Sequence, residues 1–265
     1  NSMKKHFLIF TLSLLFFSLA QGKVRLPAMM GDHMVLQQNS SVKLWGWADG
    51  KKVTVTTSWN NRTYKVTPDK DGAWLVKVDT PAGSYTPYSI TISDGTRTTL
   101  SDILIGEVWI CSGQSNMEFM LKQASTARLD IPHAADQELR LYDMKARWRT
   151  NAVEWETTVL DSLNHLQYYK DTEWKECAPE TVSDFSAIAY YFGKMLRDSL
   201  KVPVGLICNA VGGSPTEAWI DRTSLEYHFP AILKDWTQND FIQEWVRGRA
   251  ALNIKKSVNN RQRHP

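Results

Sequence analysis

Residues 103–120 read ILIGEVWICSGQSNMEFM and indicate the class of fold that the chain adopts. The run at 103–110 is mostly apolar, which is typical of a strand buried on both faces of a parallel sheet. A polar segment, 112–117, follows where this strand ends. Because ligands of open parallel sheets bind at the carboxyl ends of the strands, we expect Ser115 to be presented to a ligand site.

A second strand of the same character lies further along the chain. Apolar residues recur at helical spacing over 183–200, and the apolar run VGLICNAV follows at 204–211. Ser214 has the position of an N-cap, with Pro215 at the first helical position and Glu217 at the third. The alternation of strand and helix predicts a parallel sheet covered by helices, and therefore an α/β fold.

The residues before this region follow a different pattern. Short runs between 24 and 100 alternate or favour β-branched and aromatic residues, and Asp-Gly pairs suited to tight hairpins occur between or after them. Such regular short strands predict a small β-sandwich domain at 23–101, followed by the α/β domain at 102–265. The expected strands are 41–48, 52–59, 62–67, 73–78 and 88–93.

The first residues have the layout of a secretory signal peptide. Lys4 and Lys5 precede an apolar run at 7–19, and Ser18-Leu19-Ala20 form a small-residue cleavage pattern. The apolar run is shorter than the ~20 residues that a membrane-spanning helix needs. A permanent N-terminal anchor is the alternative. We expect residues 1–22 to be removed, and the mature protein to be periplasmic or secreted by a bacterium, with no membrane attachment.

Composition argues against several classes of function. The formal net charge is +3, and without Lys4 and Lys5 the chain has 29 basic against 28 acidic residues. It therefore has no broad basic field with which to attract nucleic acid. The three cysteines are too few for a disulfide scaffold and lack the spacing of a zinc site. We expect neither a metal nor a cofactor.

Two loops at the predicted strand ends have the residues for acyl transfer. Ser115 is a candidate nucleophile, and its backbone N–H lies near a helix N-terminus, where developing negative charge is stabilised. The N–H groups of Gly212 or Gly213 are candidate partners in holding an oxyanion. The alternatives are structural: Ser115 as a capping serine, and the glycine loop as a flexible helix entry.

In combination these motifs resemble the sialate O-acetylesterase family, a branch of the SGNH-type esterases. The resemblance rests on RLP at 25–27, GDHMVLQQ at 31–38, VKLWGW at 42–47, GEVW at 106–109, SGQSNM at 112–117, VGLI at 204–207 and GGSPTEAW at 212–219. It implies an SGNH-like parallel sheet flanked by helices, preceded by the β-rich domain. It also implies Ser115 as nucleophile, and Ser115, Gly212 and Gly213 as the oxyanion site.

The chain departs from the family pattern in one respect. Family members carry a Gln-Gly-Glu-x-Asn segment on a later strand and an Asp-x-His pair that supplies the general base, and neither occurs here. We therefore interpret the sequence as a C-terminally truncated chain with an incomplete sheet, inactive and poorly stable by itself. The histidines present are poor candidates for the base. His33 belongs to the β domain, and His264 precedes a proline with no Asp two positions before it. Surface or packing roles are expected for His133, His165 and His228.

The leading hypothesis is a secreted carbohydrate O-acetylesterase that removes acetyl groups from O-acetylated sialic acid. We further expect Gln114, Asn116, Met117 and Glu217, which belong to the two motifs, to contact the substrate. One alternative is an esterase acting on acetylated xylan or pectin. The alternative of another class is a non-catalytic sugar-binding protein, or an inactive fragment, that uses the β domain and the Trp-rich segment 121–182. The oligomeric state stays open.

Overall fold

The computed structural model of the chain describes residues 24–50, 52–147, 162 and 167–232, so the expected signal peptide lies outside the described residues. Two compact units divide the chain. The first holds the residues up to Cys111 together with Phe119–Met144 and Asp171–Cys208. The second holds Ser112–Glu118, Lys145–Lys170 and the residues from Asn209 onward.

The N-terminal part of the first unit is built from strands that pair antiparallel, except for the first strand, which is parallel to the seventh. Their bounds are β1 (Val35–Gln37), β2 (Ser41–Trp47), β3 (Val53–Thr57), β4 (Arg62–Val66), β5 (Ala73–Asp79), β6 (Ser84–Ser93) and β7 (Arg97–Gly113). β2 pairs with β5, whereas β3 lies between β4 and β6, and β6 pairs with the first part of β7. The five strands expected from the alternating pattern are confirmed, because each overlaps an observed strand.

Alternation of burial along these strands produces their shared core. In β3, Val53 and Val55 are fully buried while the side chain between them is half-buried, and Ile90 and Ile92 repeat this spacing in β6. Trp74 of β5 is buried in the same cluster. Because consecutive side chains point to opposite faces of a strand, a period of two was enough to predict these elements.

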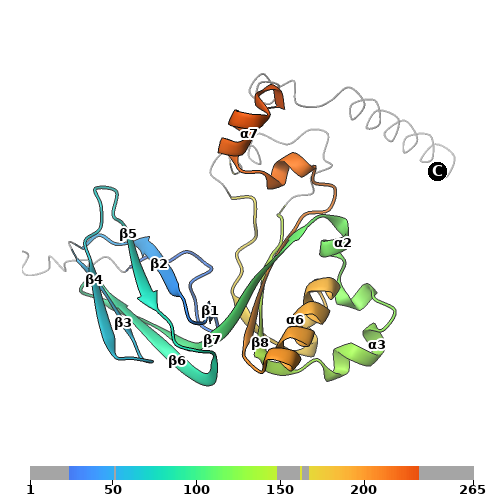
Figure 1. Cartoon of the computed structure of the whole chain (residues 1–265), viewed down its shortest axis with the longest axis horizontal. Coiled ribbons are helices and arrows are strands. Elements are labelled where there is room, and N and C mark those ends of the chain that lie inside the picture. Colours follow the sequence, from blue (N-terminus) through green and yellow to red (C-terminus); the bar gives the residue numbers. More distant parts are fainter. Residues whose placement is uncertain (1–23, 51, 148–161, 163–166, 233–265) are drawn as a thin grey trace, which may run out of the picture. The chain divides into compact units, whose positions relative to one another are not determined.

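β7 connects the two parts of the first unit. Its beginning belongs to the antiparallel strands, and it continues without interruption into the sheet that α6 (Ala187–Leu200) covers, through the boundary expected at 101/102 (Figure 1). The domain limits themselves stay a prediction. The other strands of that sheet are β8 (Asp136–Met144), β9 (Trp174–Cys177) and β10 (Val204–Ala210).

Among the described residues, the larger sheet has the order β4-β3-β6-β7-β10-β8-β9, with β1 parallel to β7. The direction of β10 beside β7 follows from two backbone hydrogen bonds. Glu107 N–H donates to Pro203 O (2.9 Å), and Val211 N–H donates to Gly113 O (3.0 Å), so residue numbers rise together along both strands. The result is a mixed sheet with parallel strands flanked by helices, which confirms the expected α/β class.

Gly106 allows β7 and β10 to approach closely. A Cβ atom at this position would lie 2.0 Å from the carbonyl oxygen of Pro203, a backbone atom that cannot move aside like a flexible side chain. Glycine is therefore required where the strand that leads to Ser115 meets the start of β10.

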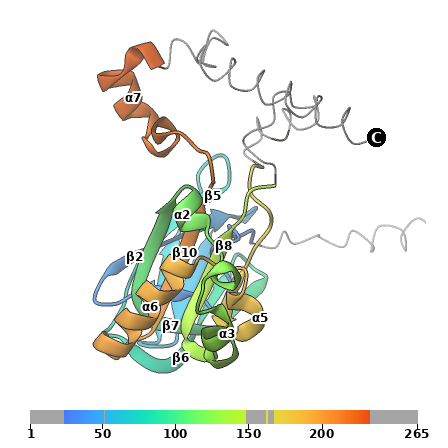
Figure 2. The same cartoon turned by 90° about the vertical axis from the view of Figure 1, so that its right-hand side faces the viewer.

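The longest described helix, α6, packs on one face of the sheet over β7 and β10 (Figure 2). Phe192 meets Trp109 of β7 edge-on at 5.2 Å, and a Cβ on Gly193 would lie 2.5 Å from Leu206 of β10. The short helices are η2 (Leu121–Gln123), α3 (Ala127–Asp130), η3 (Ile131–His133) and α5 (Pro179–Val182). None of the described helices is long and apolar enough to cross a membrane.

The helix predicted over 183–200 begins later than expected. Its N-cap is Ser186, whose hydroxyl accepts from the Ala189 N–H, and α5 ends before it as a separate short helix. The apolar spacing did identify the helix, but the cap determines where it starts. Its end was predicted correctly: Lys201 adopts a left-handed conformation (φ 57°) just before Pro203.

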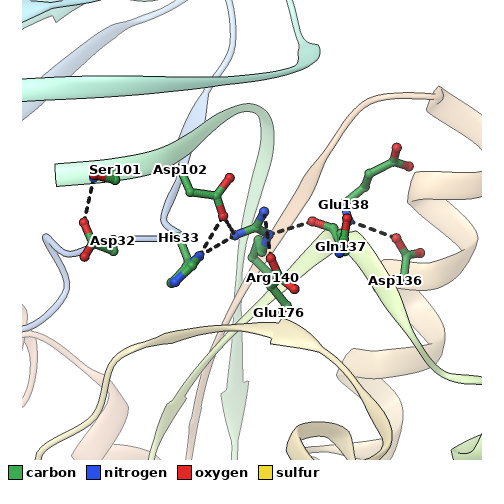
Figure 3. Close-up of polar contacts among 9 residues, drawn as sticks. All are labelled: Asp32, His33, Ser101, Asp102, Asp136, Gln137, Glu138, Arg140 and Glu176. Atoms are coloured by element: carbon green, nitrogen blue, oxygen red, sulfur yellow. Dashed lines mark hydrogen bonds and ion pairs between the residues drawn. The ribbon is translucent and has the colours of Figure 1, made fainter.

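A buried cation holds four segments of the first unit together (Figure 3). Arg140 of β8 is 2% exposed, and its guanidinium donates to Asp102 of β7 (2.6 Å) and lies 3.6 Å from Glu176 of β9. His33, which precedes β1, contacts both Asp102 (2.7 Å) and Arg140 (3.1 Å). From its place in the sequence, His33 was expected only to belong to the β domain, and the structure places it in this cluster.

The cluster also explains the acidity of Asp102. Burial alone raises the pKa of this carboxyl, but the hydrogen bonds from Arg140 and His33 outweigh burial and hold its pKa below the usual value. The ligand atoms of His33, Asp102 and Glu176 lie within 4.8 Å of one another, as in a cation site. Because the Arg140 guanidinium already donates to Asp102, it supplies the positive charge there.

Candidate active site

The second unit holds the segments that the sequence analysis singled out. α2 (Ser115–Glu118) begins directly after the end of β7, with Ser115 as its first residue. Ser115 is exposed. A strand that ends in a sharp turn into a helix presents its first helical residue at the edge of the sheet, and Ser115 occupies this position.

Ser115 is hydrogen-bonded to its own neighbour. Its hydroxyl donates to Gln114 Oε1 (2.9 Å), and its backbone N–H lies 3.2 Å from the same oxygen. The side chain of Gln114 therefore accepts from both the hydroxyl and the backbone N–H of Ser115. In the described part of the chain, the hydrogen bonds of Ser115 go to Gln114 and not to an imidazole.

The glycine loop lies against the Ser115 turn. Val211 N–H donates to Gly113 O (3.0 Å), and a Cβ on Gly212 would lie 3.8 Å from Ser115 Cα. The structure thus brings together two motifs that the sequence analysis expected at neighbouring strand ends. Gly213 follows in the left-handed region (φ 81°), which favours glycine because it has no Cβ.

The Gly212 amide has a partner that the sequence analysis did not identify. Its N–H donates to Oε2 of Glu118 (2.9 Å), the last residue of α2. Glu118 lies within the stretch 103–120, and no role was predicted for it from the sequence. The signal that would have found it is its spacing, because residues three apart on a helix lie on the same side, and Glu118 is three residues from Ser115.

The helix predicted to start with Ser214 as its cap has a different structure. The described element is the short 3₁₀ helix η4 (Thr216–Trp219), with Pro215 at the cap position and no capping side chain. The Ser214 hydroxyl donates to Val211 O (2.7 Å) and accepts from Trp219 Nε1 (2.9 Å). The predicted capping box is therefore wrong, because the serine closes its own loop instead. The next helix after η4 is α7 (Arg222–His228).

The residues expected to contact substrate differ in their positions. Gln114 contacts Ser115, and Asn116 is exposed beside it. Met117 is half-buried and faces Gly113, where an added Cβ would lie 3.2 Å from its own Cβ. Glu217 lies half-buried in η4, and its role stays a prediction, as do the roles of the other three.

Two tyrosines of the second unit lie near these loops. The Tyr169 hydroxyl donates to Asn209 Oδ1 at the end of β10 (2.7 Å), and its ring meets that of Tyr168 edge-on at 5.1 Å. Burial raises the pKa of Tyr168 most, and the nearby Tyr169 and Glu118 raise it further. Both hydroxyls are therefore neutral at physiological pH. Both tyrosines belong to the segment 121–182, which the sequence suggested only as part of a sugar-binding surface.

The histidines are in the positions expected where they are described. His133 and His228 are exposed, whereas His165 and His264 lie outside the described residues.

Comparison with known proteins now identifies the family. A family model described as "Carbohydrate esterase, sialic acid-specific acetylesterase" matches residues 105–240, which include both loops. The sialate O-acetylesterase of Rattus norvegicus is 33% identical over 213 residues, covering 76% of this chain and 38% of the rat protein. The Homo sapiens sialate O-acetylesterase is 30% identical over 218 residues, covering 76% of this chain and 40% of the human protein.

A solved structure is similar as well. The carbohydrate acetylesterase from Xanthomonas citri superposes with a TM-score of 0.66 at 30% identity, covering 79% of this chain and 45% of that protein. The chain therefore spans about two fifths of the length of the curated relatives that it matches. The resemblance read from the sequence motifs is confirmed: the chain belongs to the family of sialic acid-specific acetylesterases among the carbohydrate esterases.

Proposed function

We propose that the protein to which this chain belongs is a carbohydrate O-acetylesterase that removes acetyl groups from O-acetylated sialic acid, with Ser115 as nucleophile. The observation that carries the proposal is the position of Ser115 at the end of β7, with the Gly212 loop against its turn. The matched family, and relatives such as the rat sialate O-acetylesterase, support the substrate class.

The chemistry follows from these groups. The Ser115 oxygen attacks the acetyl carbonyl carbon while its proton passes to a general base, and the carbonyl oxygen becomes an oxyanion. Backbone N–H groups of Ser115 and of the glycine loop stabilise this charge once the Gln114 side chain has turned away from the Ser115 N–H. The intermediate collapses as the sugar oxygen leaves with a proton, and water then releases acetate from the acetylated serine. The base is the His of the Asp-x-His pair that the family resemblance implies.

The test compares acetate release by the full-length protein and its Ser115→Ala variant. We expect kcat on 9-O-acetylated sialic acid to fall at least about 10³-fold, because the nucleophile is lost. Ser112→Ala is the matched control, since Ser112 is an exposed serine near the end of β7 with no assigned role. Ser115→Ala turnover equal to that of the wild type would refute the proposal.

The sugar is tested by the same assay. Acetylated xylan and acetylated pectin are offered beside the sialic acid ester at equal acetyl concentration. A higher kcat/KM on either polysaccharide would mean that this polysaccharide, and not sialic acid, is the preferred substrate. The proposed esterase mechanism would be unaffected.

A non-catalytic sugar-binding role is the second candidate, and one observation favours it. Trp45 and Trp47 lie on the same side of β2 and are 37% and 38% exposed. Exposed indole faces two residues apart on a strand are suited to stack against sugar rings. If wild type and Ser115→Ala both bind the glycan and neither releases acetate, this candidate replaces the esterase.

Export is part of the proposal, supported by the basic start and the apolar run of residues 3–22. Fractionation of cells that express the full gene tests it: we expect the protein in the periplasm or medium, shortened by the signal peptide.

A further inference from the structure

A carboxylate occupies one of the amides of the glycine loop. Glu118 Oε2 accepts from Gly212 N–H at 2.9 Å, and these two residues are 94 positions apart in the chain. Glu118 therefore ties the loop after β10 to the helix that begins with Ser115.

This contact is the second of two that fix successive amides of the loop. Val211 N–H is held by Gly113 O, and Gly212 N–H by Glu118. With both amides fixed, the orientation of the Gly213 N–H depends on the φ and ψ angles of Gly212 alone, and Gly213 itself follows in the left-handed region at φ 81°.

We propose that Glu118 is a positioning residue for the esterase reaction: by holding Gly212 N–H, it orients the Gly213 amide as the loop's oxyanion donor beside Ser115. This inference rests on the proposed function. It reassigns the oxyanion role within the loop, because an amide that donates to a carboxylate is not available to the substrate unless the carboxylate moves away.

The role of Glu118 depends on its geometry as an acceptor and not on its charge. A negative charge close to a developing oxyanion opposes the reaction, so the carboxylate itself offers no electrostatic advantage. Glutamine retains an acceptor oxygen at the same distance from the backbone and removes the charge. Glu118→Gln is therefore expected to preserve the tie, whereas Glu118→Ala removes it.

The experiment measures kcat and KM of the full-length protein on an acetylated sugar. We expect Glu118→Ala to lower kcat about 10- to 100-fold with KM within about 2-fold, because misplacing one oxyanion donor affects the transition state and not substrate binding. Glu118→Gln should recover kcat to within about 3-fold of the wild type. The matched control is Glu226→Ala, since Glu226 is an exposed residue of α7 paired with Arg222.

Hydrogen exchange of the loop amides provides a readout that does not depend on activity. We expect the segment 209–214 to exchange faster in Glu118→Ala than in the wild type and in Glu118→Gln, also when each change is made in the Ser115→Ala background. This comparison stays informative if Glu118→Ala lowers stability, because Glu118→Gln retains the acceptor.

Several results would overturn the inference. The first is a higher kcat in Glu118→Ala, which would mean that the carboxylate blocks the site. The second is an equal loss of kcat in Glu118→Ala and Glu118→Gln. The third is hydrogen exchange of the loop amides that is unchanged in Glu118→Ala. If Ser115→Ala retains full activity, the proposed function fails instead. The two failures are therefore distinguishable.

Discussion

At the scale of single residues, the buried guanidinium of Arg140 is a charged group outside the candidate site that needs partners to compensate its charge. It is 2% exposed, and its Nε donates to Gln137 O (2.7 Å) in addition to its ion pair with Asp102. Removal of one partner from a buried pair leaves an uncompensated charge, which is costlier than the loss of a surface pair. Asp102 therefore matters for stability far more than an exposed carboxylate with the same type of partner.

We predict that Asp102→Asn lowers the free energy of unfolding by about 2–3 kcal/mol at pH 7. Asp79→Asn is the matched control, because Asp79 pairs with Arg62 at 3.4 Å with both side chains more than 60% exposed, and we expect it to cost less than about 1 kcal/mol. Urea unfolding of both variants measures the difference. Equal losses would contradict the structural role of the cluster.

The pH dependence of this loss has a definite sign. The pKa of Asp102 is lower in the folded chain than in the unfolded chain, so its contribution is fully present above the unfolded value and disappears as the pH falls through the folded value. The gap in stability between wild type and Asp102→Asn should thus be constant from pH 8 to pH 5 and narrow below about pH 4.

At the scale of elements, the junction of β7 and β10 is a close backbone contact that requires glycine at position 106. Along β7, this contact precedes the turn that holds Ser115. Strand and helix periodicity predicted both partners of this junction. They did not predict the start of α6 or the structure after Ser214, because side-chain hydrogen bonds of Ser186 and Ser214 determine those boundaries.

We predict that Gly106→Ala lowers the free energy of unfolding by at least about 2 kcal/mol, because the added methyl would lie 2.0 Å from the backbone oxygen of Pro203. Gly31→Ala is the matched control, since its added Cβ would have an ordinary contact at 3.9 Å. Thermal unfolding of the two variants tests the difference. A Gly106→Ala variant as stable as Gly31→Ala would show that the strands separate without cost.

At the scale of the whole molecule, local patterns and tertiary contacts were predicted unequally well. The strands of the N-terminal part, the α/β class and the meeting of the Ser115 and Gly212 segments followed from periodicity and from motifs at strand ends. The cluster of His33, Asp102 and Arg140 did not, because its members come from separate segments that only the folded chain brings together. The Glu118 contact was missed for another reason: the two segments were expected to meet, but no role was predicted for the residue three positions after Ser115.

Whether this chain is catalytically active by itself depends on a base that accepts the Ser115 proton. A serine hydroxyl is a weak nucleophile at neutral pH unless a base accepts its proton, and here it donates to the Gln114 amide oxygen, which is not basic. We therefore predict that the 265-residue chain hydrolyses an aryl acetate no faster than its own Ser115→Ala variant, whereas the full-length protein shows a large difference between the same two forms. A phosphonate probe that reacts only with activated serines should label the full-length protein and not the chain. Sustained, Ser115-dependent turnover by the chain would mean that a base within these residues reaches the hydroxyl.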